Sequence, residues 1–342
     1  MESLVSKSLE AGQALWQGRR VLVTGATGMV GSWLVKELLA RRADVVALVR
    51  DADPQTELFR SGDIHRVQVV SGTLEDFRAV ERAINENETD TVFHLGAQTI
   101  VGTAHRSPLP TLEANIRGTY YLLEACRLHA SLVQRVVVAS SDKAYGEAEA
   151  LPYTEEMPLR GQHPYEVSKS CSDLLTQAYC RTYGLRAAVA RCGNLYGGGD
   201  LNWSRIVPGT IRSYLFGERP VLRSNGTYVR DYMYVKDAVQ AYLRLAECLD
   251  DDSVRGQGFN FSPEQPLAVL DIVQQIQKLM EGAAAAPVIL NCADGEIHSQ
   301  YLSAARARRA LNWSTRFSLE AGLRETIAWY RSFFAGAKAA RA

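Results

Sequence analysis

The stretch RVLVTGATGMVG, residues 20–31, decides the fold. Its apolar start predicts a buried strand over 20–24, and the amphipathic pattern that begins at Gly31 predicts a helix over 31–41. Glycines at 25, 28 and 31 let the turn approach a pyrophosphate at the N-terminus of that helix. Although such a turn can also form with no ligand, the strand–turn–helix context predicts a dinucleotide site. Its cofactor-binding residues are Gly25, Thr27, Gly28, Met29, Val30 and Gly31.

Valine-rich apolar runs alternate with amphipathic helix patterns through the first half of the chain, which predicts a parallel sheet covered on both faces. Further strands are expected at 44–50, 66–71, 91–95, 135–140 and 185–191, with helices near 75–85, 112–129 and 164–183. After Tyr196 the pattern becomes irregular, and a late strand is expected at 259–262. We therefore expect an α/β fold with a Rossmann-type doubly wound sheet, formed by 19–196 plus 231–262. A smaller, discontinuous substrate lobe would comprise 197–230 plus 263–335.

Composition limits the functional classes. The 342 residues are 46% hydrophobic, enough for one large core with an attached lobe. The 38 Lys and Arg balance the 38 Asp and Glu, so nothing favours a nucleic-acid or anionic-membrane partner. Six scattered cysteines lack Cys-x-x-Cys spacing and predict neither a metal site nor disulfides. With no long apolar run and no leader pattern, a cytoplasmic protein is expected.

Five residues form the expected catalytic group. Ser141, Asp142 and Lys143 follow the strand over 135–140, at the edge where ligands of open α/β sheets bind. Tyr165 and Lys169 are four residues apart on a predicted helix, so they share one face. The Lys169 ammonium is expected to lower the pKa of the Tyr165 phenol and make it a base for an alcohol proton. Taken alone, each group also fits a polar loop or an ordinary amphipathic helix.

Other candidates flank this group. Arg50 ends the second strand and fits the 2'-phosphate of NADP, whereas the neighbouring Asp51 suits the ribose diol of NAD. Leu95, at the end of the fourth strand, and Ala97, just after it, are further expected cofactor-binding residues, as are Tyr165 and Lys169. Arginine forks match phosphate oxygens, and an asparagine after the sixth strand reaches the same region. The expected substrate-binding residues are Asn194, Arg205 and Arg230.

Together these motifs resemble the extended short-chain dehydrogenase/reductase superfamily, and within it the nucleotide-sugar 4,6-dehydratases, from about residue 20 to 330. The motifs that carry the resemblance are Gly25-x-x-Gly28-x-x-Gly31, His94-Leu95-Gly96-Ala97-Gln98, Asn115, Ser141-Asp142-Lys143, Tyr165-x-x-x-Lys169 and Val229-Arg230-Asp231-Tyr232. The Ser-Asp-Lys triplet, Gly197-Gly198-Gly199-Asp200 and Gln300-Tyr301-Leu302 look most like the CDP-glucose branch. Val229-Arg230-Asp231-Tyr232 looks more like the dTDP- and UDP-sugar enzymes, which leaves the nucleotide base open.

The resemblance implies a redox-neutral cycle on a nucleoside-diphosphate hexose, with NAD or NADP tightly bound and recycled. In it Tyr165 takes the C4 hydroxyl proton, Asp142 protonates the leaving 6-hydroxyl, and Lys143 removes the C5 proton. This role needs a lowered lysine pKa, expected from burial and from Lys169; the reverse allocation of Asp142 and Lys143 stays open. A nucleotide-sugar 4-epimerase would use the same Ser141, Tyr165 and Lys169, and a noncatalytic NADP-sensing regulator is a third alternative.

The helices over 112–129 and 164–183 carry apolar residues beyond one core stripe. These are Tyr120, Tyr121, Leu174, Leu175 and Tyr179. Apolar residues beyond those needed for the core suit pairing of these helices with a second copy across a two-fold axis, so a homodimer is expected.

Overall fold

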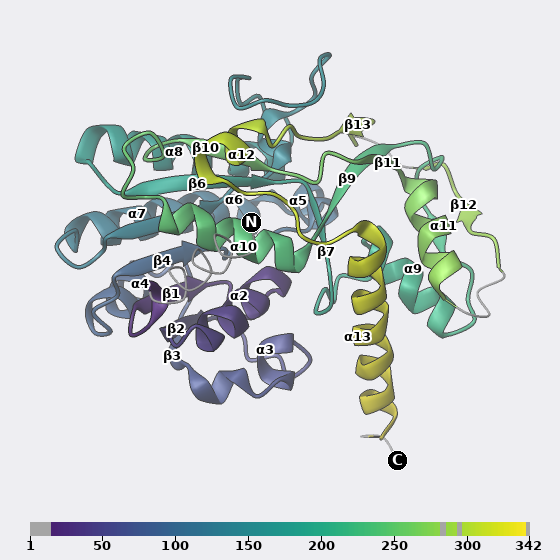
Figure 1. Ribbon diagram of the computed structural model, residues 1–342, viewed down its shortest axis with the longest axis horizontal. Helices are drawn as coiled ribbons and strands as arrows, with labels where there is room; N and C mark the ends of the chain where they lie inside the picture. Colours follow the sequence, from purple (N-terminus) through teal and green to yellow (C-terminus); the bar gives the residue numbers. More distant parts are fainter. Residues whose placement is uncertain (1–14, 281–284, 293–295, 340–342) are drawn as a thin grey trace, which may run out of the picture.

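The computed structural model describes residues 15–280, 285–292 and 296–339. A seven-stranded parallel sheet forms its centre, in the order β10-β6-β5-β4-β1-β2-β3 (Figure 1). The strands are β1 (Arg20–Thr24), β2 (Asp44–Val49), β3 (Gln68–Ser71), β4 (Thr91–His94), β5 (Arg135–Ala139), β6 (Ala187–Cys192) and β10 (Gly258–Phe261). The chain order reverses between β1 and β4, which creates the crevice where such sheets bind ligands. The predicted doubly wound α/β fold is confirmed.

Alternating strand residues fill two separate cores. Val21 and Val23 of β1 point to the face covered by α2 (Met29–Ala40), α10 (Val235–Glu247) and α12 (Ala305–Leu311). Leu22 points to the opposite face, covered by α4 (Phe77–Asn85), α7 (Gly118–Leu128) and α8 (Pro164–Tyr183). Because each strand contributes side chains to both cores, its sequence is a continuous apolar run and does not alternate between apolar and polar residues.

The helix expected over 112–129 is longer and not regular. It starts with α6 (Pro108–Leu112) and continues through a π-helical turn, η2 (Glu113–Arg117), into α7. The wider turn carries Asn115, whose Oδ1 accepts from the Gln98 amide at 2.7 Å and whose Nδ2 donates to Ser168 at 2.9 Å. These bonds tie the loop after β4 to α8, which carries Tyr165 and Lys169.

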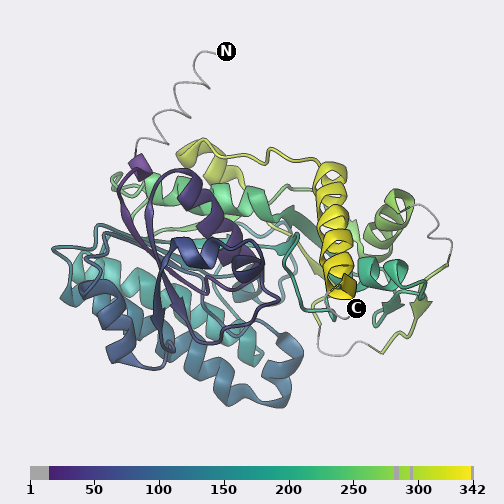
Figure 2. The same cartoon turned by 90° about the horizontal axis from the view of Figure 1, so that it is seen from below.

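The lobe packs beside the carboxyl edge of the sheet. Its helices in the described residues are α9 (Ile206–Leu215), α11 (Val269–Leu279) and α13 (Leu319–Ala339), which lie to one side of the sheet domain (Figure 2). They pack around one apolar cluster. Two small sheets complete it: β8 (Val221–Leu222) with β12 (Val288–Ile289), and β7 (Asn194–Tyr196), β9 (Val229–Tyr234), β11 (Pro266–Ala268) and β13 (Ser299–Gln300). β7 and β9 pair with each other although they lie at the expected domain boundaries near 196 and 231.

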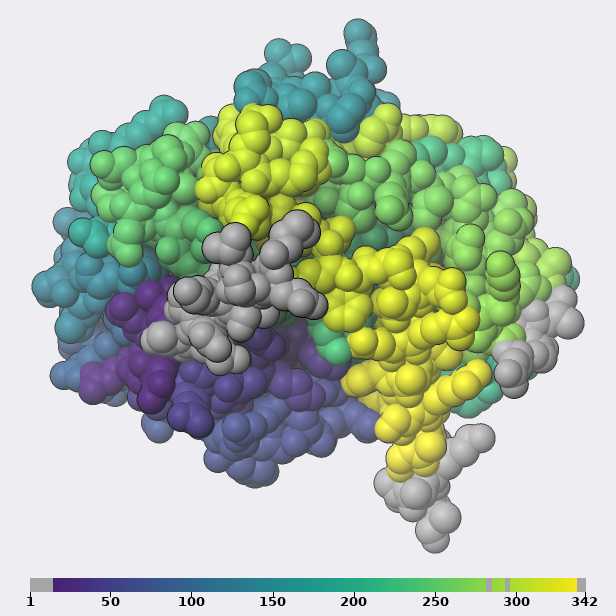
Figure 3. All heavy atoms as spheres, in the orientation of Figure 1, coloured from purple at the N-terminus to yellow at the C-terminus, as the bar shows by residue number. Residues whose placement is uncertain are grey.

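The remaining short elements are α3 (Glu57–Arg60), η1 (Asp63–Arg66), α5 (Val101–Arg106) and η3 (Asp142–Tyr145). α3 joins the lobe to the sheet domain, because Glu57 accepts from the Trp329 indole at 2.7 Å and Arg60 lies over the Phe333 ring. The space-filling view shows the yellow C-terminal segment between the blue N-terminal region and the green lobe (Figure 3). Within the described ranges, the helices are too short or too polar to cross a membrane.

Candidate active site

A cavity of about 1170 Å³ lies between the carboxyl edge of the sheet and the lobe. All seventeen residues expected to bind cofactor or substrate or to act in catalysis line it, although they come from segments between Gly25 and Arg230. The sheet contributes the turn after β1 and the ends of β4 and β5. Helix α8 and the lobe supply the other walls. Their individual roles stay predictions.

The glycine turn fits a pyrophosphate. Gly25 has a positive φ of 70°, and a Cβ there would lie 2.7 Å from the amide nitrogen of Gly96. A Cβ on Gly31 would overlap the Gly25 carbonyl, so the first turn of α2 can pack closely only with glycine. The N-terminus of α2 thus faces the cavity with its backbone exposed to a ligand, and Thr27 and Met29 line the same wall. This part of the cavity has the shape and the donors that a dinucleotide needs.

At the end of β2, the residue expected to bind the phosphate of NADP and the residue expected to bind the ribose of NAD are paired with each other. Arg50 Nε donates to Asp51 Oδ2 at 2.6 Å, and the two side chains are 66% and 70% exposed. A guanidinium that turned to a 2'-phosphate would have to leave this pair, as would a carboxylate that turned to a ribose diol.

Ser141 connects the expected base to the expected acid. Its Oγ donates to Asp142 Oδ1 at 2.8 Å and is also in hydrogen-bonding contact with the Tyr165 phenol. Ser141 caps η3 by accepting from the Lys143 amide at 3.2 Å, so the turn that carries Asp142 and Lys143 is fixed from its first residue. Among the described residues, the buried Asp142 Oδ2 has no hydrogen-bond partner. A carboxyl oxygen is therefore left for a ligand.

Burial moves Asp142 and Lys143 in opposite directions. It raises the pKa of Asp142, which favours the neutral acid, and lowers the pKa of Lys143, which favours the neutral amine. The cation that adds to the effect on Lys143 is Arg230. The expected contribution of Lys169 to this pKa is wrong.

The expected effect of Lys169 on Tyr165 is also wrong for this arrangement of charges. Burial raises the pKa of Tyr165 to about 12, and the cation that opposes this rise is Arg205. Lys169 Nζ donates instead to the Ala139 carbonyl at 2.8 Å, and burial lowers the pKa of Lys169 to about 8. The two side chains share a helix face, yet the ammonium is directed at the end of β5.

The three expected substrate-binding residues differ in the hydrogen bonds and ion pairs that their side chains already form. Asn194 Nδ2 is buried and, within the described part of the chain, has no partner. Arg205 forms an ion pair with Asp200 at 3.2 Å. Arg230 is 7% exposed and donates to the carbonyls of Val229, His298 and Ile297. Arg230 is thus held at the cavity wall by three backbone carbonyls.

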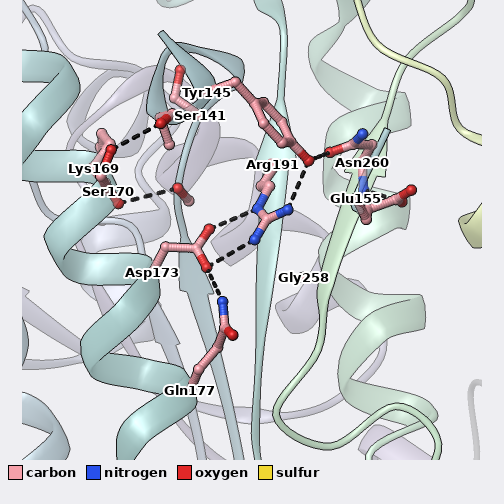
Figure 4. Close-up of polar contacts among 12 residues, drawn as sticks. Ser141, Tyr145, Glu155, Lys169, Ser170, Asp173, Gln177, Arg191, Gly258 and Asn260 are labelled. Carbon is pink, nitrogen blue, oxygen red and sulfur yellow. Dashed lines mark hydrogen bonds and ion pairs between the residues drawn. The ribbon is translucent and has the colours of Figure 1, made fainter. Parts of the chain in front are cut away.

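A buried polar network supports η3 and was missed from the sequence (Figure 4). Arg191 of β6 donates to the Tyr145 hydroxyl at 2.7 Å, and this hydroxyl donates to Asn260 Oδ1 of β10 at 2.8 Å. Asp173 of α8 binds the other side of the guanidinium. The signal available in the sequence was a charged residue inside the apolar run AAVARC, since a buried arginine needs a partner. Tyr145 ends η3, so the network holds the turn at its C-terminal end.

Residues 21–260 match the family described as the NAD dependent epimerase/dehydratase family. The chain is 30% identical over 337 residues to CDP-glucose 4,6-dehydratase of Salmonella typhimurium strain LT2, covering 94% of this chain and 93% of that protein.

Two solved structures are similar. The UDP-glucose 4-epimerase of Thermotoga maritima, with UDP-glucose, has a TM-score of 0.83 at 27% identity, covering 92% of this chain and 99% of the other. The dTDP-glucose 4,6-dehydratase DesIV of Streptomyces venezuelae, with NAD and TYD bound, has a TM-score of 0.79 at 25% identity, covering 92% and 97%. Because the family match spans more than half of the residues, the chain belongs to the NAD-dependent epimerase/dehydratase family of extended short-chain dehydrogenases/reductases.

Proposed function

We propose that this protein is a nucleoside-diphosphate-hexose 4,6-dehydratase that forms a 4-keto-6-deoxy sugar. The observation that carries the proposal is the pair Asp142 and Lys143, held by one turn beside Tyr165, with burial favouring a neutral acid and a neutral amine. Removal of water across C5 and C6 needs one proton donor and one proton acceptor. Simple oxidation and return of hydride at C4 needs only one group that takes and returns the hydroxyl proton, a role that Tyr165 can fill.

The cofactor in this proposal is NAD or NADP that remains bound through turnover. The glycine turn would hold its pyrophosphate, Leu95 and Ala97 its nicotinamide end, and Arg50 or Asp51 its adenosine ribose. When bound, the nicotinamide would supply the acceptor for the C4 hydride and a positive charge in its oxidised form, and the donor that returns the hydride to C6 in its reduced form.

The first step uses Tyr165. Its oxygen takes the proton of the C4 hydroxyl, and Ser141 orients both groups through its own hydroxyl. A tyrosine phenol is protonated at neutral pH and burial raises its pKa further, so the step depends on positive charge nearby, to which Arg205 already contributes.

Elimination then uses η3. The Lys143 lone pair takes the C5 proton, and the C5–H electron pair becomes the C5–C6 double bond. The C6–O bond breaks, and Asp142 gives its proton to the departing hydroxyl, which leaves as water. The directions in which burial moves the two groups favour this allocation over the reverse one.

The substrate in this proposal is a nucleoside-diphosphate hexose. Arg205, Arg230 and Asn194 form the polar wall on the lobe side, where guanidinium groups suit a diphosphate. The likeness to the Salmonella CDP-glucose enzyme and the Asp-Lys pair favour CDP-glucose as the first substrate to test.

A 4-epimerase is the second candidate, favoured by the likeness to the Thermotoga UDP-glucose 4-epimerase. Incubation with CDP-, UDP-, GDP- and dTDP-hexoses, followed by mass spectrometry, separates the alternatives. Loss of one water from the sugar supports the dehydratase. A new isomer of unchanged mass supports the epimerase. Dinucleotide binding with no conversion of any sugar nucleotide supports a noncatalytic regulator.

We also infer a homodimer paired through α7 and α8. Leu128, Leu174 and Tyr183 on these helices are each more than half exposed, whereas Leu175 and Tyr179, which were expected on this surface, pack against the core. Large apolar side chains on adjacent helices suit a shared four-helix interface.

A further inference from the structure

Gln300 is a buried side chain beside the proposed C5 base. It lies in β13, which runs parallel to β9 and places Gln300 opposite Arg230. Its side chain is 0% exposed. The lobe therefore places a neutral amide behind Lys143, which lines the cavity wall.

The oxygen and the nitrogen of this amide differ in their hydrogen bonds. Lys143 Nζ donates to Gln300 Oε1 at 2.9 Å, across 157 residues of sequence. Within the described residues, the buried Nε2 has no hydrogen-bond partner. A buried unpaired donor costs free energy, which an apolar side chain of the same size would avoid. Packing alone therefore does not account for a glutamine at this position, whereas the bond to Lys143 does.

Several charges act on the same amine. Asp142, Glu166 and Glu296 favour its ammonium form, and Arg230 opposes it. Gln300 makes the direct contact and adds no charge. A carboxylate in its place would pair with the ammonium at hydrogen-bonding distance and keep the proton on Lys143.

We propose that Gln300 is a positioning residue for the dehydration step, which holds the Lys143 amine at the cavity wall through an uncharged acceptor. This inference rests on the proposed function. After Lys143 has taken the C5 proton, the new ammonium still donates to Gln300 Oε1, so the amide serves the amine in both of its protonation states.

The first test measures Lys143 directly and needs no turnover. Purified protein is treated with a limiting amount of acetic anhydride between pH 6 and pH 11, and acetylation of Lys143 is followed by peptide mass spectrometry, with the exposed Lys278 as reference. Gln300→Glu should raise the midpoint of Lys143 labelling by about 1–3 pH units. Gln275→Glu, an exposed position of α11, is the matched control and should leave it unchanged. A midpoint that does not move in Gln300→Glu overturns the proposal.

The second test uses turnover and a variant without a new charge. Gln300→Met fills similar space but offers no acceptor, so reduced nicotinamide should form at the wild-type rate while the later release of product slows about 10-fold or more. Substrate KM should stay within about two-fold. An unchanged rate of product release in Gln300→Met overturns the positioning role. If the wild-type protein releases no dehydrated sugar, the proposed function fails, whereas the labelling result still judges the contact between Gln300 and Lys143.

Discussion

Asp173 and Arg191 form a fully buried ion pair, with Arg191 Nε at 2.7 Å from Oδ2 and Nη2 at 3.0 Å from Oδ1 (Figure 4). The pair joins α8, which carries Tyr165 and Lys169, to β6. Through the Tyr145 hydroxyl it also joins η3, which carries Asp142 and Lys143. One charged contact therefore ties together the two elements that hold the proposed acid and bases.

Loss of one member of this pair should be far more damaging than loss of both. Asp173→Ala leaves the Arg191 charge buried without its partner, so the free energy of unfolding should fall by about 3–5 kcal/mol in urea titrations. The double variant Asp173→Leu with Arg191→Met should recover most of that loss. Glu320→Ala, which breaks an ion pair between side chains that are each 62% exposed, is the control and should change stability by less than about 1 kcal/mol. Equal losses in the buried and exposed variants would contradict this account.

Lys143→Met should separate oxidation from dehydration. The variant keeps Tyr165 and Ser141 but has no base for the C5 proton, so reduced nicotinamide should accumulate together with the 4-keto sugar. Stopped-flow absorbance follows the first, and mass spectrometry follows water loss. Tyr165→Phe is the comparison and should abolish both signals, with a loss on the order of 10² or more. Release of the 4-keto-6-deoxy product by Lys143→Met at the wild-type rate would exclude Lys143 as the base.

The sequence predicted features that local pattern determines. Strand β1 has the predicted bounds, and α8 begins and ends where expected. Both are set by local features of the sequence: the spacing of apolar residues, a proline at the start of the helix and a glycine after its end. The i,i+4 spacing placed Tyr165 and Lys169 on one face, but it could not reveal that the Ala139 carbonyl takes the ammonium. The contacts Lys143–Gln300 and Tyr145–Asn260 span 157 and 115 residues, and they depend on how the late segments return over the sheet. The apolar pattern predicted that 259–262 returns to the sheet, but it did not predict that Asn260 would meet Tyr145 or that Gln300 would meet Lys143.

Arg50→Ala tests the choice of dinucleotide. If the guanidinium binds a 2'-phosphate, the variant should weaken NADP binding by roughly 1.5–3 kcal/mol and leave NAD nearly unchanged. Asp51→Ala is the counterpart and should weaken NAD if that carboxylate binds the ribose diol. Isothermal titration with both dinucleotides measures each effect. Equal small losses for both in Arg50→Ala would remove Arg50 from this role.

Leu174→Glu tests the proposed dimer. Leu174 is 55% exposed on α8, and a charge there should prevent burial of this face against a second copy. Light scattering at micromolar concentration should give the mass of two chains for the wild type and of one chain for the variant. Leu290→Glu, at a lobe position that is 52% exposed, should remain dimeric. A wild-type mass of one chain would contradict the inference.

Asp231 should make the protein less stable as pH rises. Burial raises the pKa of this carboxyl to about 7, although Ser262 and the Leu302 amide both donate to its Oδ2. In the unfolded chain an aspartate titrates near pH 4. The folded state therefore binds this proton more tightly, and stability from this group falls between about pH 4 and pH 7 and is level above that range.

Asp231→Asn removes the titration while keeping an oxygen for Ser262 and Leu302. The difference in free energy of unfolding between the variant and the wild type should grow by roughly 1–3 kcal/mol in favour of the variant as the pH rises from 5 to 8. Urea titrations at several pH values measure this difference. Carboxyls that do not interact with Asp231 contribute equally to both proteins, so the difference between them reports Asp231 together with its repulsion from Asp142. Asp252→Asn is the control, because that side chain is 90% exposed and should give no such gain. A difference between wild type and Asp231→Asn that stays constant with pH would mean that Asp231 is ionised in the folded protein throughout this range.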